Sequence, residues 1–398
     1  MIAKLCLIFL FVVMTVFGLA GSSGAQSDAE TATAGIVYLG QKGDPYYEPD
    51  LAYTGLSLKD LDRPVIGAEM AVRSARVLSR SLGLKFTLDV VLIEPGASAL
   101  DAVKEAFASE AVAVLLDLPE PAFEEVVASK LESKLLINIR HRDDKWRGVG
   151  CAPNLLHTIP SYGMRADAMA QHLRVKGWDR VLLLHGETQE DLIETTAVRK
   201  AIAKFGLRLA DDRVFELTNN PSKRDESNVP LLTGGVRHDV VWIVDNDGEF
   251  GRYVPYETYD PRPVVGTEGL TASAWHWTYE RHGGPQLNQR FRSASDSIMQ
   301  PEDWAAWVAV RSLIEAVTRV GSADPDLVRD YVQSDALSVN LYKGVAGSFR
   351  AWDGQLRQPI LLATHNAVIG AAPFTQFQHQ TNSLDTLGTD GAETDCKR

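Results

Sequence analysis

The stretch AVAVLLD at residues 111–117 decides the fold class, because it is an unbroken apolar run that ends in one carboxylate. A strand that is apolar on both faces is typical of a parallel sheet with helices packed on both sides. The residues before and after it, 98–107 and 121–131, have the apolar spacing and capping residues of helices. The region therefore predicts a helix–strand–helix unit of an α/β sheet.

The same alternation of strand and helix extends in both directions. Before this unit, a helix that stops at Gly83 is predicted from residues spaced as on one face, namely Ile66, Met70, Val77 and Leu82. Other strands are predicted at residues 35–40, 86–93, 135–139, 180–184, 240–244 and 264–266, and other helices from Ser161 to Gly177, up to Gly206 and around Trp304. Residues 343–363 predict a hairpin around Trp352-Asp353-Gly354. Two such series predict an α/β protein with two doubly wound parallel-sheet lobes joined by a hinge.

The order of these series suggests where the lobes begin and end. Lobe 1 is predicted to comprise residues 34–158 and 271–338, and lobe 2 residues 159–270 and 339–374. The hinge is expected near residues 159–161 and 270–271. Residues 375–398 form a polar C-terminal segment that is expected to wrap a surface or to be disordered.

Composition and missing motifs exclude several classes of function. The 398 residues carry a net charge of −12, which argues against nucleic acids and anionic lipid headgroups as partners, because such binding depends on clustered Lys and Arg. The sequence contains no dinucleotide-binding glycine motif, no phosphate-binding loop, no zinc-protease motif and no serine nucleophile elbow. The chain is therefore predicted not to be an enzyme, and to have neither a cofactor nor a metal ligand.

Residues 1–25 have the three parts of a secretory signal peptide. Lys4 precedes an apolar run at residues 5–20, and Ser23-Gly24-Ala25 fits a cleavage site with small residues. The alternative is an uncleaved anchor helix, since the run approaches the shortest length that spans a bilayer. Cleavage near Ala25 predicts an exported, periplasmic protein.

Three cysteines are present, and Cys6 leaves with the leader. The remaining pair, Cys151 and Cys396, is predicted to form a disulfide, because export provides an oxidising compartment and each thiol has one intramolecular partner. The alternative is two free thiols.

Several segments carry a resemblance to a known family. The crossing segment at residues 154–161, NLLHTIPS, resembles that of type I periplasmic solute-binding proteins, particularly the branched-chain amino-acid-binding group. Further blocks resemble the ABC-transporter substrate-binding proteins associated with PQQ-dependent alcohol dehydrogenase systems, and these blocks are residues 151–157, 250–270, 285–291, 303–311, 354–360 and 384–390. The resemblance implies a monomeric periplasmic protein that binds a small solute between two lobes and delivers it to an inner-membrane permease and ATPase. The alternative is a periplasmic sensor or assembly factor that uses the same fold without transport.

Ligands of open α/β sheets bind beyond the carboxyl ends of the strands, and this rule selects the candidate residues. They are Gln41, Asp117, Arg140 and His141 in lobe 1, and His185, Glu187, Asp245 and Asn246 in lobe 2. The alternative for each is an ordinary solvated or capping residue, since such side chains favour turns. Pro119 and Pro121 remove backbone donors that a carboxylate would need, which argues against an amino acid as the ligand. Because strand ends are exposed, substitution of Asp117 or Arg140 is expected to cost little stability.

Overall fold

The computed structural model describes residues 32–398 except residues 53, 130, 132, 218 and 219. Residues 31–398 form one compact unit. The leader predicted for residues 1–25 lies outside the described residues. In the described part of the chain, no helix is long and apolar enough to cross a membrane.

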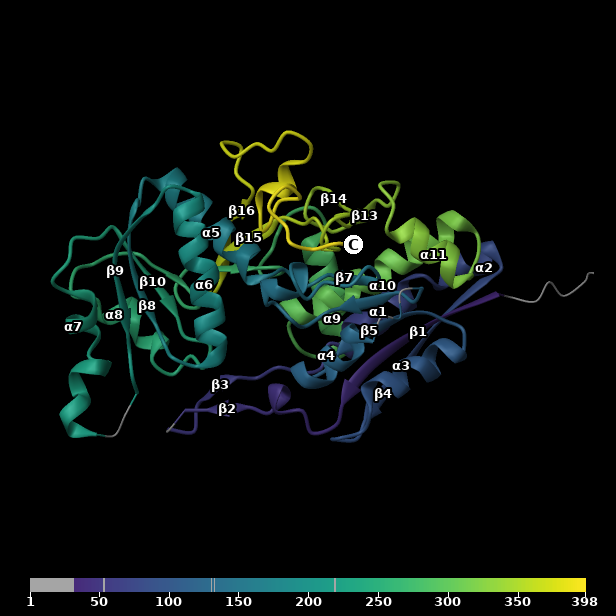
Figure 1. The fold of residues 1–398 in the computed structure, drawn as a ribbon, viewed down its shortest axis with the longest axis horizontal. Helices are drawn as coiled ribbons and strands as arrows, with labels where there is room; N and C mark the ends of the chain where they lie inside the picture. Colours follow the sequence, from purple (N-terminus) through teal and green to yellow (C-terminus); the bar gives the residue numbers. More distant parts are fainter. Residues whose placement is uncertain (1–31, 53, 130, 132, 218–219) are drawn as a thin grey trace, which may run out of the picture. The chain divides into compact units, whose positions relative to one another are not determined.

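The first lobe is built on a five-stranded parallel sheet in the order β4-β1-β5-β6-β7 (Figure 1). Its strands are β1 (Ala32–Gln41), β4 (Leu84–Ile93), β5 (Ala111–Asp117), β6 (Leu136–Asn138) and β7 (Leu155–His157). The central strand β5 is buried along its whole length, as its apolar sequence predicts.

Helices cover both faces of this sheet and form two separate cores. One face packs against α1 (Val65–Ser74), α9 (Gly284–Ser295), α10 (Pro301–Val320) and α11 (Pro325–Val332), and the other against α3 (Ala99–Ala108) and α4 (Glu120–Ala128). In the first core, the stacked rings of Trp275 and Trp304 are 6.2 Å apart, so late helices complete the lobe that the early strands begin.

The helix predicted to stop at Gly83 is in fact two helices, α1 and α2 (Arg76–Leu82), separated by Ala75. Helix α2 does end at Gly83, whose φ of +64° favours glycine. Val77 and Leu82, however, are 82% and 45% exposed, so their predicted place on the buried face is wrong. The break at Ala75 explains the difference, because it interrupts the helical spacing on which that prediction relied.

The second lobe is built on a four-stranded parallel sheet in the order β11-β10-β8-β9. Its strands are β8 (Arg180–His185), β9 (Arg208–Val214), β10 (Val240–Val244) and β11 (Val264–Gly266). One face packs against α5 (Tyr162–Lys176) and α6 (Gln189–Lys204), and the other lies toward α7 (Val229–Thr233) and α8 (Val254–Glu257), as Figure 1 shows. The sequence pattern does not indicate β9, RLADDRV, because it is an edge strand whose charged side chains hide the alternation.

A third, antiparallel sheet of β12 (Thr271–Ser273), β15 (Ile360–Thr364) and β16 (Ala367–Ala372) follows the crossing from the second lobe. The hairpin predicted around Trp352-Asp353-Gly354 is present but short, with one antiparallel bridge between Phe349 and Leu356 and backbone hydrogen bonds from Arg350 to Gln355 and from Arg357 to Ser348. A longer hairpin, β15–β16, follows it and is not predicted by the sequence pattern. Val339 and Phe349 pack into the core of the first lobe.

The remaining elements are short. Two strand pairs are β2 (Asp50–Leu51) with β3 (Ser57–Lys59) and β13 (Val339–Asn340) with β14 (Ala346–Gly347). The 3₁₀ helices are η1 (Pro45–Tyr47), η2 (Asp144–Arg147), η3 (Pro221–Ser227), η4 (Gly251–Tyr253) and η5 (Ser383–Thr386).

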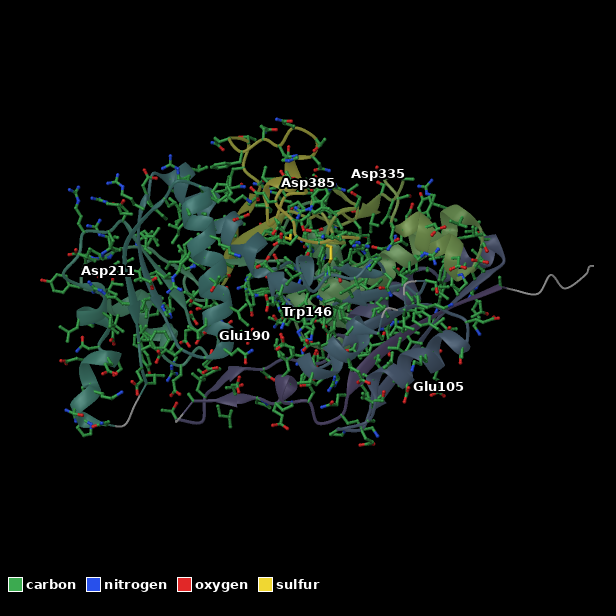
Figure 2. The ribbon with its side chains drawn as sticks, viewed as in Figure 1. Glu105, Trp146, Glu190, Asp211, Asp335 and Asp385 are labelled. Atoms are coloured by element: carbon green, nitrogen blue, oxygen red, sulfur yellow. A yellow bond between two sulfur atoms is a disulfide. The ribbon has the colours of Figure 1, made fainter. Side chains whose placement is uncertain are left out.

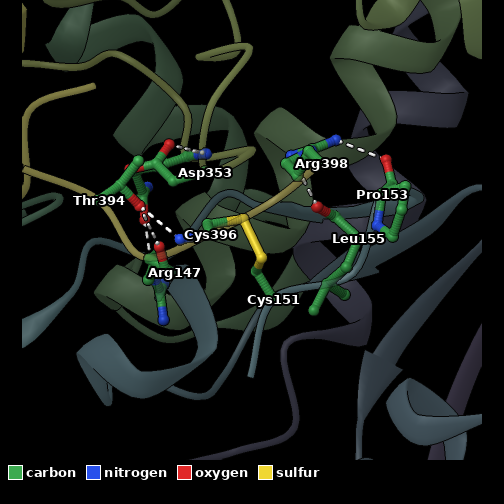
Figure 3. Close-up of a disulfide and its surroundings, with 9 residues drawn as sticks. Arg147, Cys151, Pro153, Leu155, Asp353, Thr394, Cys396 and Arg398 are labelled. Carbon is green, nitrogen blue, oxygen red and sulfur yellow. Dashed lines mark hydrogen bonds between the residues drawn. A yellow bond between two sulfur atoms is a disulfide. The ribbon is translucent and has the colours of Figure 1, made fainter. Parts of the chain in front are cut away.

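The C-terminal segment, residues 375–398, contacts both lobes. Asp385, labelled in Figure 2, is buried and accepts hydrogen bonds from Arg350 at 2.9 Å and Arg357 at 2.8 Å. In the second lobe, the Lys204 ammonium donates to the Gly388 carbonyl at 2.8 Å. In the first lobe, a disulfide joins Cys396 to Cys151, whose Cα atoms are 5.7 Å apart (Figure 3). The segment therefore ties the two lobes together near the point where the chain crosses between them.

Candidate ligand-binding site

The carboxylate of Asp117 is the centre of a polar cluster at the carboxyl end of the first sheet. It accepts hydrogen bonds from the hydroxyls of Tyr38 and Tyr47, the second at 2.6 Å, and pairs with Arg63 at 3.1 Å. Burial raises the pKa of Asp117, although Arg140 and these donors lower it in part. Asp117 is 0% exposed, so the expectation of an exposed charge at this strand end is wrong. Several chain segments converge on this carboxylate and hold it in place.

Arg140 follows β6 and links the cluster to the loop after β1. Its guanidinium donates to the carboxylate of Asp44 and lies 3.7 Å from that of Asp117. It also stacks over the ring of Tyr46, 4.3 Å from the ring centre. Burial opposes the charge of Arg140, but the hydrogen bond to Asp44 and the charge of Asp117 raise its pKa overall. Arg140 therefore keeps its charge, and its neighbours compensate it.

Arg142 lies two residues further along the same loop and pairs with a carboxylate from a distant helix. Its Nη2 lies 2.7 Å from Oε1 of Glu302, in the first turn of α10, and the Tyr46 hydroxyl donates to the same oxygen at 3.4 Å. Although burial opposes it, Glu302 raises the pKa of Arg142. The Nε of Arg142 is buried and has no hydrogen-bond partner among the described residues. Arg142 thus has one donor to spare within the cluster.

The cluster continues into the second lobe through the start of α5. The amide of Tyr162 donates to the Arg142 carbonyl at 2.9 Å, and the Tyr162 hydroxyl donates to Glu190 in α6. Glu190, in the first turn of α6, is labelled in Figure 2. Burial raises the pKa of Tyr46, and the negative charges of Glu302 and Glu190 raise it further. Polar groups of both lobes therefore meet around Tyr46.

Two of the lobe 1 candidates have other surroundings. His141 turns inward, where its Nε2 lies 2.8 Å from the Leu118 carbonyl and its ring packs 4.4 Å from that of Phe123. Phe123 in turn packs on Trp146, which Figure 2 labels. Burial, with Arg140 beside it, lowers the pKa of His141 to about 4. Gln41 is half-buried at the end of β1, and its carbonyl accepts from Arg63.

The lobe 2 candidates mostly hold their own lobe together. The Nδ1 of His185 lies 2.7 Å from the Gly186 carbonyl, and its Nε2 lies within 3.2 Å of both Arg199 and Asp212. The ring of His185 is buried, and its contacts lie in α6, in β9 and in its own strand end.

Asp245 caps the turn after β10, and Asn246 links that turn to α6. The carboxylate of Asp245 accepts from the amides of Gly248 at 3.1 Å and Gly251 at 2.6 Å, and burial raises its pKa. The amide and side chain of Asn246 donate to Asp191, at 2.8 Å and 3.0 Å. Glu187, by contrast, is exposed just before α6 and borders a shallow hollow.

The strand-end rule finds Asp117 and Arg140 but misses most of their neighbours. The residues missed are Tyr38, Asp44, Tyr46, Tyr47, Arg63, Arg142, Tyr162, Glu190 and Glu302. A signal for three of them is the DPYY motif at residues 44–47, directly after the end of β1. Glu302 has no such signal, because only the return of α10 to the first lobe brings it near. No group of three or more His, Cys, Asp or Glu side chains in the described part of the chain could hold a metal ion.

Solved structures with a similar fold are numerous, although their sequences differ greatly. An ABC transporter substrate-binding protein from Sphaerobacter thermophilus has a TM-score of 0.69 and 14% identity, over 90% of this chain and 100% of that one. A periplasmic binding protein from Burkholderia mallei has a TM-score of 0.63 and 12% identity, over 92% of this chain and 98% of that one. A solute-binding protein from R. palustris, in complex with benzoate, has a TM-score of 0.63 and 13% identity, over 92% and 100%.

No protein-family model matches the sequence, and no curated protein matches it. The assignment therefore rests on three-dimensional similarity, which extends over nearly all of the described chain and over whole neighbours. With its two parallel-sheet lobes, the protein has the fold of the type I periplasmic binding proteins.

Proposed function

We propose that the protein is the periplasmic solute-binding component of an ABC transporter, and that it holds a small solute between its lobes. The observation that carries this proposal is the cluster around Tyr46, where side chains of lobe 1 meet the first turns of α5 and α6. Tyr46 and Tyr47 are half-buried, so their rings have both a supporting side and an accessible side. The position beyond the carboxyl ends of the strands is where ligands of α/β sheets bind. An inner-membrane permease and ATPase would be the partners.

The charges of the cluster favour an uncharged solute. Its guanidiniums face carboxylates in pairs or shared contacts, formed by Arg63 and Arg140 with Asp117 and Asp44, and by Arg142 with Glu302. The remaining carboxylate of the cluster, Glu190, accepts a hydrogen bond from the Tyr162 hydroxyl. An ionised solute would have to compete with these contacts and would leave one partner buried without its counter-charge, which is costly. A neutral solute with hydroxyl or carbonyl groups would instead accept from Arg142 Nε and pack on the tyrosine rings.

Alcohols and the aldehydes or ketones to which they are oxidised belong to this neutral class. The sequence resemblance to binding proteins of PQQ-dependent alcohol dehydrogenase systems supports the same choice. We therefore propose that the solute is an alcohol or a carbonyl compound derived from one, linked to periplasmic alcohol oxidation.

A solute between the lobes would favour closure about the crossings near residues 159–161 and 270–271. Closure makes a direct prediction for small-angle scattering, because the lobes approach when the solute binds. Scattering curves that superimpose with and without the identified solute would contradict closure.

The sharpest test is native mass spectrometry of the protein purified from its own periplasm. We expect a retained neutral compound in the wild type and its loss in Arg142→Gln, which removes the charge and the spare donor. Arg252→Gln is the matched control, because Arg252 lies on the second lobe beside Tyr253 and outside the cluster. Equal retention of the compound by both variants, with melting temperatures unchanged, would contradict the proposed site.

A further inference from the structure

We infer that the first lobe carries a second binding site, for a small carboxylate with an apolar body, in a groove between α1, α9 and α10. These helices lie side by side (Figure 1), and the groove between them has a volume of about 640 Å³. Volumes of this size are typical of sites for small molecules. The groove is separate from the polar cluster described above, and none of its lining residues belongs to that cluster.

Positive charge without an anionic partner is the first feature of this groove. Arg290 and Arg311 line it, and neither has a carboxylate within 4.0 Å among the described residues. The third arginine, Arg73, lies 3.5 Å from Glu69. The chain carries a net charge of −12, and most arginines of the first cluster are paired with carboxylates. A group of guanidiniums that this acidic protein leaves largely uncompensated would attract an anion.

The second feature is a tyrosine held in a strained backbone conformation at the edge of the groove. Tyr342 has a φ of +57°, in the left-handed region that bulky residues rarely adopt. This conformation places its ring 5.6 Å from that of Trp307, edge to face, and its hydroxyl accepts from Arg290 at 2.9 Å. Packing against Trp307 and the hydrogen bond from Arg290 thus hold Tyr342 in this conformation, and the hydroxyl orients one of the guanidiniums.

The neighbouring chain is adapted to the same ring. Gly283, with a φ of +84°, approaches Tyr342 so closely that a Cβ at this position would lie 2.9 Å from the ring. A larger residue would displace the tyrosine, so the glycine permits the approach. The backbone at Gly283 and the backbone at Tyr342 are therefore both adapted to the position of the tyrosine ring at this groove.

The walls decide which anion fits. The half-buried ring of Tyr342 and the exposed Ala294 give the groove its accessible apolar lining, whereas Trp307 and Leu287, which also border it, are almost fully buried. Inorganic phosphate would leave this apolar surface unused, whereas an aromatic or aliphatic carboxylate would place its charge at the guanidiniums and its body on the tyrosine ring. The groove therefore selects an amphipathic carboxylate, and this choice does not depend on the solute of the cluster between the lobes.

Fluorine NMR with para-fluorobenzoate tests this site on the full mature chain. We expect the wild type to bind the probe, and Arg311→Gln and Arg290→Gln to weaken binding about tenfold or more, the usual loss for a charge-assisted hydrogen bond. Arg311→Lys, which keeps the charge, should recover part of the affinity. Arg292→Gln is the matched control, because Arg292 lies on α9 like Arg290, is exposed and does not line the groove. Binding of the neutral analogue para-fluorobenzyl alcohol should not change when either arginine is substituted.

Several results would overturn the inference. They are the absence of probe binding by the wild type, equal binding by Arg311→Gln and the wild type, or loss of binding in Arg142→Gln alone, which would place the anion between the lobes. Binding of a glutamate-rich peptide without binding of para-fluorobenzoate would also overturn it, in favour of a docking surface for an acidic protein.

Discussion

The carboxyl ends of the two parallel sheets use similar polar residues in different ways. In lobe 1, Asp117 and Arg140 contact side chains from segments far apart in the sequence. In lobe 2, Asp245 accepts from amides a few residues ahead of it, and Asn246 donates to Asp191 in the first turn of α6. The polar residues of lobe 1 thus form a cluster of long-range contacts with half-exposed tyrosine rings, whereas those of lobe 2 stabilise the turns next to them.

This difference shows what the strand-end rule can and cannot decide. The rule correctly locates polar residues at the edges of both sheets, but it does not say whether their hydrogen-bonding capacity is already used. Capping consumes the carboxylate of Asp245 and both donors of Asn246 that face Asp191. Around Arg142 a donor remains without a protein partner among the described residues. We therefore expect lobe 1 to contribute most of the binding energy for a solute.

The largest effect is expected for Asp117→Ala. The substitution leaves Arg63 and two tyrosine hydroxyls in a buried region without their acceptor and removes the carboxylate beside Arg140, so the free energy of unfolding should fall by about 3–5 kcal/mol. Chemical denaturation measures this loss. Asp117→Asn is the matched variant, and it should lose less because it retains an acceptor oxygen. An unchanged denaturation midpoint for Asp117→Ala would show that the contacts of Asp117 do not stabilise lobe 1, and would remove the difference between the carboxyl ends of the two sheets.

A pH-dependent effect of similar size is expected from His141, because its pKa of about 4 in the folded protein lies below the ordinary value of 6.5. Between these values the unfolded chain binds a proton that the folded protein does not, so the stability falls as the pH falls from about 6.5 to about 4. Linkage makes this loss about 3 kcal/mol. His141→Gln should reduce the slope of stability against pH in this window, whereas His365→Gln, at an exposed position, should not. Parallel slopes for His141→Gln and the wild type would show that the histidine is not buried as described.

A smaller effect is expected for Asn246→Ala at the edge of lobe 2. The substitution removes one side-chain hydrogen bond to Asp191, which still accepts from the backbone amide of residue 246. The cost should be about 1 kcal/mol, measured by thermal or chemical unfolding, and the retained solute should not change. Loss of the solute in this variant would assign a direct binding role to the lobe 2 edge.

The smallest effect is expected for Glu187→Gln. Glu187 is exposed, and no hydrogen bond or ion pair of its side chain is present within the described residues, so the stability should change by less than about 0.5 kcal/mol. The amount of solute that the Glu187→Gln variant retains, measured by native mass spectrometry, should match that of the wild type. A clear drop would mean that the second lobe supplies a charged contact after closure.

The sequence predicts the strands better than the site, and the reason is the range of the interactions. Apolar runs such as residues 111–117 depend on burial by whichever helices cover them, so they can be recognised locally. The polar cluster depends on contacts such as Arg142 with Glu302, which are 160 positions apart, and no local pattern reports that distance. Edge strand β9 is hidden for the opposite reason, since its solvent-facing charges mask a regular ladder.

Together with the proposed export, the covalent link between Cys151 and Cys396 would impose an order on maturation. The two cysteines are 245 residues apart, and all strands of the second sheet lie between them. A chain that is exported with its N-terminal part first would expose Cys151 to the oxidant while its partner had not yet crossed. During that interval its thiol is open to pairing with other proteins, so we expect biogenesis to depend on a thiol–disulfide exchange catalyst. A chain cut short before Cys396 would keep one unpaired thiol, a chemical mark by which incomplete molecules differ from finished ones.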